Sequence, residues 1–359
     1  NSHKILQKEL EDRSSRIKDV PPATFNLNSR PERDILRYIK EYSVFKKPEY
    51  SYPWSKDVRK ALVQVFKLKR FRQSQLDAIN TTLNGQHCFV LMPTGGGKSL
   101  CYQLPAIIDS GRTRGVTVVV SPLLSLIKDQ VDHLVHHFNI PAVAFTGDTE
   151  PQLKSWISSE LLKPSTPIRI VYTTPEMLVS SRHFSDILQS LYDRGLFSRF
   201  VVDEAHCVST WGHDFRPKYT AIGPERQRFP QVPVLALTAT ANHAVRSDVI
   251  SCLGIHGCVT LEQSFNRPNL KYEIVQKDSN MADGIANFIN TYYPKECGII
   301  YCLSQKDCED MSSKLGPLNI SVSYYHAGMQ PEDKMAVQEQ WANNTVKVIC
   351  ATIAFGMGI

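Results

Sequence analysis

The stretch Met92-Pro93-Thr94-Gly95-Gly96-Gly97-Lys98-Ser99 decides the fold of this chain, because it joins a short apolar run to a helical one. Residues 88–91 are apolar and bounded by polar residues, as in a buried strand, and residues 100–104 continue at helical spacing. Glycines carry no Cβ, so backbone N–H groups can surround a polyphosphate at the positive end of the next helix. The residues predicted to hold it are Thr94, Gly95, Gly96, Gly97, Lys98 and Ser99.

Two side chains of this loop have specific predicted roles. Lys98 would reach the terminal phosphates, and the Ser99 hydroxyl would ligate Mg²⁺. The complete motif has glycine at the position of Met92, so the loop matches only the Gly-Lys-Ser end of the pattern. A glycine turn that merely precedes a helix is the alternative, which the loop by itself leaves open.

The composition is that of an ordinary globular protein with room for two domains. The chain has 359 residues, 42% of them hydrophobic and 21% charged, and domains hold roughly 100 to 200 residues. No apolar stretch approaches the roughly 18 residues that cross a bilayer, and residues 1–20 have no apolar signal core. We therefore expect neither secretion nor membrane insertion. The nine cysteines show no Cys-x-x-Cys spacing, so we expect reduced thiols and no zinc site.

The net charge of +6 is unevenly distributed along the chain. Residues 1–70 hold 17 Lys and Arg against nine Asp and Glu, whereas the remainder holds 24 against 26. This balance permits a polyanionic partner without requiring one. Residues 1–50 are expected to form a peripheral helix or two, and either a solvated charged face or direct contact with nucleic acid would explain their charge.

The residues upstream of the glycine loop suggest an adenine nucleotide. After residues 71–75, helical spacing continues through Leu76 and Ile79. Gln75 offers both a donor and an acceptor to the edge of adenine, and the planar guanidinium of Arg72 can stack on its ring. Surface polar residues without a ligand are the alternative.

Strands alternate with helices along most of the chain. Apolar, β-branched runs occur at residues 115–120, 142–145, 168–172, 200–202 and from 234, with helical stretches at 123–138 and around Trp156 and Leu161. This order predicts an α/β fold with a parallel sheet and helices on both faces, where ligands bind at the carboxyl ends of the strands.

Asp203-Glu204-Ala205-His206 directly follows the apolar strand at residues 200–202, so two adjacent carboxylates stand at a strand end. Asp203 can hold Mg²⁺ together with Ser99, and Glu204 can orient and deprotonate the water that attacks the γ-phosphate. The alternative is that these acids cap the next helix.

The segment Trp211-Gly212-His213-Asp214-Phe215-Arg216-Pro217 is dense in aromatic, basic and glycine residues, which is typical of a loop that contacts a polymer. Trp211 and Phe215 can stack on bases, while Arg216 can meet phosphate. Its position beside Glu204 would let strand binding control hydrolysis. An ordinary packed aromatic loop is the alternative.

A second α/β pattern follows a polar connector. We expect strands at residues 271–275, 298–303, 322–325 and 346–350, and a helix at 331–341. A compact domain normally needs more than these roughly 90 residues, so we expect the end at Ile359 to be imposed. The predicted organisation is an extension (1–50), a first domain (51–262), a connector (263–270) and an incomplete second domain (271–359).

With these elements in order, the chain resembles the RecQ family of superfamily 2 DNA helicases over residues 52–359. The resemblance rests on Phe71-Arg72 with Gln75, Pro93-Thr94-Gly95-Gly96-Gly97-Lys98-Ser99, Ser121-Pro122-Leu123, Asp203-Glu204-Ala205-His206, Leu237-Thr238-Ala239-Thr240-Ala241, Tyr324-Tyr325-His326-Ala327-Gly328 and residues 351–359. The aromatic-rich loop at 211–217 is the most specific of them, since it separates the family from RNA helicases. Lys67 and Thr210 depart from the family, which usually has glycine and often glutamine there.

The resemblance implies two RecA-like lobes with ATP and Mg²⁺ between them and single-stranded DNA across both. It further implies 3′ to 5′ translocation and unwinding in recombination and repair, in the nucleus if the source is eukaryotic. The expected catalytic residues are Lys98, Asp203, Glu204 and His206, and the expected DNA-binding or coupling residues are Ser121, Trp211, His213, Phe215, Arg216, Thr238 and Thr240. Single-stranded and branched DNA and repair proteins are the expected partners, and a membrane is not.

The family continues past Gly358-Ile359 into an arginine-bearing motif and then a zinc-binding and winged-helix region. Because an arginine finger is worth about 10³ to 10⁵ in rate, we expect this chain to hydrolyse ATP poorly and not to unwind efficiently. One alternative is a catalytically silent, helicase-like DNA-binding module. Another is an RNA helicase or small-molecule ATPase, with RNA-stimulated or unstimulated turnover.

Overall fold

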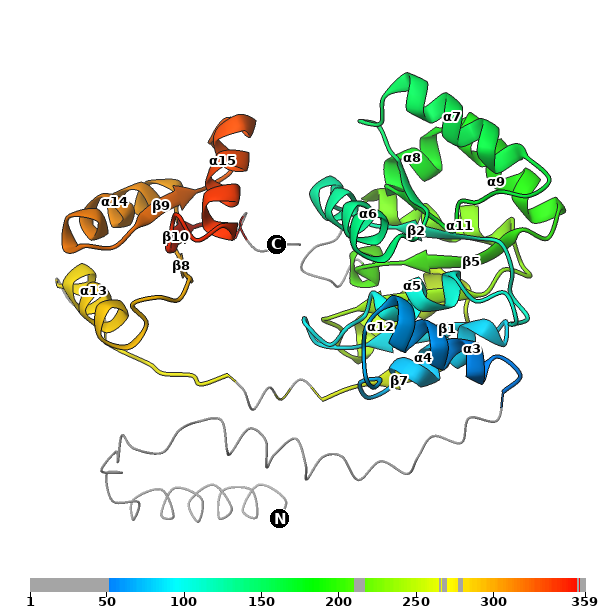
Figure 1. The fold of residues 1–359 in the computed structure, drawn as a ribbon, viewed down its shortest axis with the longest axis horizontal. Coiled ribbons are helices and arrows are strands. Elements are labelled where there is room, and N and C mark those ends of the chain that lie inside the picture. The colour runs from blue at the N-terminus through cyan, green and yellow to red at the C-terminus, as the bar shows by residue number, and fades with distance from the viewer. Residues whose placement is uncertain are drawn as a thin grey trace, which may run out of the picture. The chain divides into compact units, whose positions relative to one another are not determined.

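A computed structural model describes residues 52–209, 217–264, 266, 270–276, 280–353 and 355. These residues form two separate sheets, one of seven strands and one of three, in which every neighbouring pair is parallel (Figure 1). The predicted α/β class is thereby confirmed. Residues 1–50 lie outside the described residues, and the predicted domain boundaries stay predictions.

The large sheet has the strand order β3-β4-β2-β5-β6-β1-β7. Its strands are β1 (Cys88–Leu91), β2 (Val116–Val120), β3 (Ala142–Phe145), β4 (Ile170–Thr173), β5 (Phe197–Val202), β6 (Val234–Thr238) and β7 (Val259–Glu262). Every residue of β1, β2, β4, β5 and β6 is buried. Continuous apolar runs are typical of parallel strands covered on both faces, which is why these runs were recognisable in the sequence.

Helices cover both faces of the large sheet, as predicted (Figure 1). One core cluster contains side chains of α3 (Ser55–Lys60), the π-helix η1 (Ala61–Val65), α4 (Gln75–Leu83), α5 (Leu100–Ala106) and α6 (Leu124–Phe138). The other contains side chains of α7 (Pro151–Leu162), α8 (Pro175–Ser180), α9 (Arg182–Asp193), the 3₁₀-helix η2 (Ala205–Val208), α10 (Pro217–Thr220), α11 (Ile222–Gln227) and α12 (His243–Cys252). No helix in the described part of the chain has the length and apolar character to cross a membrane.

The small sheet has the order β8-β10-β9 and its own core. Its elements are α13 (Met281–Tyr292), β8 (Gly298–Tyr301), α14 (Gln305–Leu315), η3 (Gly316–Leu318), β9 (Val322–Tyr325), α15 (Pro331–Ala342) and β10 (Val348–Ala351). Alternate residues of β10 face opposite clusters, with Val348 and Cys350 in one and Ile349 and Ala351 in the other. The predicted strands here and the helix at 331–341 are confirmed within a few residues.

The strand predicted at residues 271–275 is wrong. Residues 270–276 form neither strand nor helix, and Tyr272 and Ile274 are 83% and 102% exposed. Their apolar side chains alternate with charged ones, which imitates a half-buried strand, but no neighbouring strand pairs with them in the described residues. Conversely, the edge strand β7, which pairs with β1, was not predicted, because its four residues mix polar and apolar types.

Candidate active site

Three adjacent strands bring the predicted nucleotide-site residues to one edge of the large sheet. The order β5-β6-β1 places Asp203, Thr238 and the loop at 92–99 at neighbouring carboxyl ends. The Met92 N–H donates to the Thr238 carbonyl at 3.1 Å, which ties the loop directly to β6. The predicted strand, loop and helix are confirmed as β1, the loop and α5, and the topology explains why residues far apart in sequence meet here.

The glycine loop adopts a conformation that depends on its glycines. Gly95 and Gly97 have φ angles of 76° and 87°, a region that other residues enter only with strain. The Gly96 N–H donates to the Pro93 carbonyl at 2.9 Å, and the Lys98 ammonium donates to the Met92 carbonyl at 3.4 Å. The Lys98 side chain therefore folds back over the loop, where its ammonium would contact a bound phosphate.

Arg72 and Gln75 contact the loop itself. The Gln75 amide nitrogen donates to the Gly97 carbonyl at 3.0 Å, while its oxygen accepts the Arg72 N–H at 2.7 Å. The Arg72 guanidinium donates to the Gly95 carbonyl. The Gln75 amide has a second hydrogen and its oxygen a second lone pair beyond these two bonds, and adenine recognition by them stays a prediction.

Asp203 and Glu204 differ sharply in environment. Asp203 is buried, whereas Glu204 is partly exposed and has a left-handed φ of 47°. Burial and the Glu204 carboxylate raise the pKa of Asp203 to about 7, against the opposing effects of the Glu204 N–H and of Lys98. The Glu204 N–H donates to the Asp203 carboxylate at 3.0 Å. A buried carboxylate that is costly to ionise is suited to a bound cation.

The residues present fit a Mg²⁺ ion. Burial, Tyr172 and Asp203 raise the pKa of Tyr102 well above its usual value, while Ser99 opposes the shift. Ser99 and Asp203, the two predicted ligands, thus both act on the Tyr102 hydroxyl. No group of three or more His, Cys, Asp or Glu side chains placed to hold a metal occurs among the described residues. A Mg²⁺ bound by one carboxylate and one hydroxyl, with phosphates and water as its other ligands, needs no such group.

His206 connects Glu204 to the end of β6. Its Nδ1 lies 2.8 Å from the Thr238 hydroxyl and 3.4 Å from a Glu204 carboxylate oxygen. The Thr238 hydroxyl accepts the Thr240 N–H and donates to the Thr240 carbonyl, both at 3.1 Å. The four residues therefore form one polar network that reaches from the predicted base to the segment after β6.

A buried polar network behind the loop was missed in the sequence. The Tyr172 hydroxyl donates to the Tyr102 hydroxyl at 3.4 Å, and the Gln103 amide donates to Tyr172 at 3.3 Å and to Gln130 at 2.8 Å. It links α5, β4 and α6. The signal that could have revealed it is the polar Gln103 inside the apolar stretch Leu100–Ala106, because buried polar side chains need partners.

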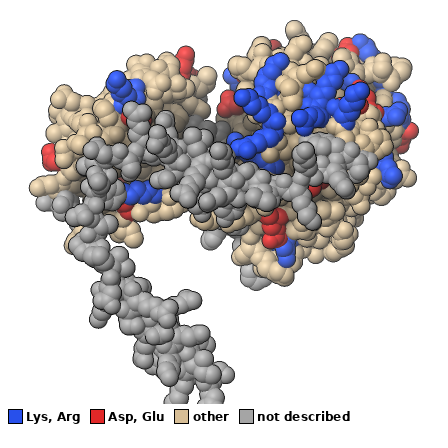
Figure 2. Space-filling view, turned by 60° about the horizontal axis from the view of Figure 1, so that its bottom comes forward, with Lys and Arg blue, Asp and Glu red and all other residues tan. Residues whose placement is uncertain are grey.

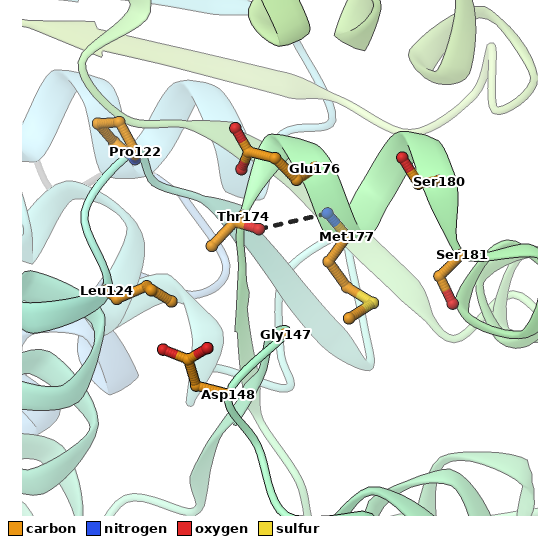
Figure 3. A pocket seen from close by; sticks show the side chains of 9 residues that line it. All are labelled: Pro122, Leu124, Gly147, Asp148, Thr174, Glu176, Met177, Ser180 and Ser181. Carbon is orange, nitrogen blue, oxygen red and sulfur yellow. Dashed lines mark hydrogen bonds between the residues drawn. The ribbon is translucent and has the colours of Figure 1, made fainter.

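A second concave site follows β2, β3 and β4. A cavity of about 610 Å³ is lined by Pro122, Leu124, Gly147, Asp148, Thr174, Glu176, Met177, Ser180 and Ser181 (Figure 3). Ser121, predicted to contact DNA, directly precedes this lining, but it is buried and its hydroxyl has no hydrogen-bond partner among the described residues. Thr174 caps α8 by accepting the Met177 N–H at 3.2 Å, as the dashed line in Figure 3 shows. The lining residues beyond the Ser-Pro-Leu motif were not predicted.

Trp211, His213, Phe215 and Arg216, in the aromatic-rich loop, lie outside the described residues. Just beyond them, the buried Tyr219 hydroxyl donates to the Asp203 carbonyl at 3.2 Å. The chain that leaves this loop is therefore tied to the predicted metal ligand.

Comparison with known proteins identifies two helicase regions. Residues 72–248 match the DEAD/DEAH box helicase family, and residues 282–359 match the helicase conserved C-terminal domain. The ATP-dependent DNA helicase hus2/rqh1 of Schizosaccharomyces pombe is 48% identical over 87% of this chain and 23% of its own length. The RecQ-like DNA helicase BLM of Xenopus laevis is 46% identical over 86% of this chain and 22% of its own length. The chain thus spans less than a quarter of either relative.

The fold is shared with a solved helicase. The DUF1998 helicase MrfA, in a crystal structure with DNA and AMPPNP, has a TM-score of 0.65 at 17% identity, over 88% of this chain and 45% of its own. The fold is therefore that of a helicase core with two RecA-like units. Together with the relatives at 46–48% identity and the two matched helicase regions, this shows that the chain belongs to the RecQ family of helicases.

Proposed function

We propose that this chain carries the motor of an ATP-dependent DNA helicase, which moves 3′ to 5′ on single-stranded DNA and separates duplexes in recombination and repair. The observation that supports this most is the network from Glu204 through His206 to Thr238, with 2.8 Å between His206 and Thr238. It connects a carboxylate beside the glycine loop to a second strand end, as coupling of hydrolysis to a polymer requires.

ATP would bind with its phosphates in the loop at 92–99. Backbone N–H groups of the loop and the Lys98 ammonium would hold the phosphate oxygens, while Ser99 and Asp203 would hold Mg²⁺. A bound Mg²⁺ supplies neutralisation of the charge that develops on the transferred phosphoryl group. Glu204 would orient the attacking water and accept its proton, and its partly exposed carboxylate is open to such a water.

Single-stranded DNA would run along the edge that holds the cavity after β2, β3 and β4. This edge continues the one that carries Asp203, since β2 lies beside β5. Trp211 and Phe215 would stack on the bases of this DNA. His206, Thr238 and Thr240 would transmit the binding of the DNA strand to Glu204. Relatives bearing the name DNA helicase, from fission yeast and frog, support DNA as the substrate. In a eukaryote this activity would place the protein in the nucleus.

Lys98→Ala tests this proposal. Removing the ammonium should abolish ATP turnover, measured as phosphate release with single-stranded DNA, because the terminal phosphates lose their cation. Binding of labelled single-stranded DNA should persist. The matched control Lys163→Ala changes an exposed lysine paired with Glu160 on α7 and should leave turnover unchanged. Turnover that survives in Lys98→Ala would refute the assignment of the loop.

A further inference from the structure

A strongly basic surface lies at the start of the described chain. Residues 56–72 contain seven Lys and Arg and one acid, Asp57, which leaves 34 basic and 34 acidic residues in the rest of the chain. The whole net charge of +6 therefore resides in this stretch. All but its last residue precede the region matched to the helicase family, which begins at Arg72. We call Lys56, Arg59, Lys60, Lys67, Lys69 and Arg70 the basic surface; Arg72, which contacts the glycine loop, belongs to the predicted nucleotide site.

The fold holds these cations outward on a rigid support. Five apolar side chains of α3, η1 and their flanks are buried in one core cluster: Trp54, Val58, Ala61, Leu62 and Phe66. This spacing forms one helical face, so Lys56, Arg59 and Lys60, which lie between these apolar residues, point to solvent. Lys67, Lys69 and Arg70 follow η1 outside any helix, and all six residues of the basic surface are exposed. Figure 2, which brings the lower side of Figure 1 forward, shows Lys and Arg gathered on the part of the molecule that is built on the large sheet.

Most of this surface forms no ion pair with the described residues. Lys56, Lys60, Lys67, Lys69 and Arg70 have no acidic partner in the described part of the chain. The one acid of the stretch, Asp57, accepts the Ser110 hydroxyl at 2.5 Å and offsets only one of its seven positive charges. Like charges held together in this way repel one another, and a polyanion would relieve that repulsion.

Lys67 provides an independent observation. Its φ is +55°, in the left-handed region where glycine is unstrained and a side chain is not. The turn is fixed by hydrogen bonds from Phe66 N–H to the Ala61 carbonyl and from Leu68 N–H to the Leu62 carbonyl. Lysine in this backbone conformation lowers the stability of the folded chain relative to glycine. Its presence at position 67 therefore points to a function for its charge.

We propose that the basic surface binds the phosphate backbone of duplex DNA, outside the nucleotide site and the single-strand path. The proposal rests on the DNA helicase function proposed above. Single strands are bound largely by base stacking on aromatic rings, yet Phe66 is buried and Phe71 half-buried. The surface therefore offers cations without stacking groups, which suits a duplex whose bases are enclosed and whose phosphates are dense.

The salt dependence of duplex binding tests the proposal. Each neutralised phosphate of B-DNA contributes about 0.9 to the slope of log affinity against log salt concentration. The variant Lys67→Ala/Lys69→Ala/Arg70→Ala should make the slope shallower by about 2.7, measured by anisotropy of a labelled blunt duplex. The matched control Arg112→Ala/Arg114→Ala/Arg182→Ala removes three exposed cations elsewhere and should keep the wild-type slope. ATP turnover without DNA should be unchanged in both.

Lys67→Gly separates binding from folding. Glycine suits the local backbone, so the Tm should not fall, while the slope should lose about 0.9. A wild-type slope in both Lys67→Gly and the triple variant would overturn the proposal. The proposal would also fail if the triple variant bound polyglutamate more weakly than the wild type but duplex DNA equally well, because that result would indicate an acidic protein partner. A wild-type chain that binds no DNA at all would instead refute the helicase function.

Discussion

Gly97 is the residue at which the glycine loop tolerates least change. A Cβ there would lie 2.3 Å from the Gln75 amide nitrogen, on a backbone with φ of +87°. Gly97→Ala should therefore displace Gln75 and lower nucleotide affinity at least about tenfold, or roughly 1.4 kcal/mol, in a fluorescent-nucleotide titration. Gly284→Ala is the control: it lies in α13 with open space around it and should raise stability by about 0.5–1 kcal/mol. Equal nucleotide affinity in the two variants would contradict the structure.

Asp203 makes the stability of the metal-free chain depend on pH. Its pKa is raised to about 7 in the folded state and is about 3.9 in an unfolded chain. The folded state thus holds this proton more tightly, so its stabilising effect is complete below about pH 4 and is lost as pH rises through about 7. Three pKa units correspond to at most about 4 kcal/mol.

The corresponding measurement is denaturant unfolding of Asp203→Asn in EDTA. The variant cannot ionise here, so it should be more stable than the wild type at pH 8, and this advantage should shrink as the pH falls toward 5. Asp310→Asn, at an exposed position of α14, controls for removal of a surface charge. An advantage of Asp203→Asn that is independent of pH would show that burial of the charge is not its cause.

At the scale of elements, α5 carries both the loop and the network behind it. Tyr102→Phe removes the hydroxyl that accepts a bond from Tyr172 and on which Ser99 acts, at a cost of about 1 kcal/mol in stability. Because this hydroxyl helps to orient Ser99, nucleotide affinity should fall roughly three- to tenfold with Mg²⁺ present, or about 0.7–1.4 kcal/mol, and remain unchanged in EDTA. Tyr192→Phe, on α9 in the other core cluster, should alter neither value. A loss of equal size in EDTA would exclude a role at the metal ligands.

The strands of the large sheet that carry the site could be predicted because each is a short apolar run buried on both faces. Phe200-Val201-Val202 and Cys88-Phe89-Val90-Leu91 are such runs; Asp203 follows the first, and the glycine loop that begins at Met92 follows the second. The strand predicted at residues 271–275 was wrong, because alternation of apolar and charged residues does not by itself provide a neighbouring strand to pair with. The bonds of Gln75 to the loop and of Tyr172 to Tyr102 could not be predicted, because they join side chains brought together only by packing.

At the scale of the whole molecule, chemistry and charge are placed in different parts of the chain. Each sheet has its own core, and the phosphate loop, the acids and His206 all belong to the large sheet. The net positive charge lies in residues 56–72, which comprise most of α3, η1 and the non-helical residues after them, and α3 and η1 cover the same sheet. We interpret the part of the chain built on the large sheet as the part that binds nucleotide and senses DNA. Glu204 would be the group that couples nucleotide hydrolysis to DNA binding.

ATP turnover of the chain, with and without single-stranded DNA, tests this account most directly when the wild type is compared with Glu204→Gln. The account predicts a low wild-type rate, as expected from the sequence, and predicts that single-stranded DNA raises it. It also predicts that Glu204→Gln, which keeps the side-chain shape but cannot accept a proton, loses about 10²- to 10⁴-fold in turnover while still binding nucleotide and DNA. A wild-type rate indifferent to DNA, or a Glu204→Gln rate equal to the wild type, would contradict it.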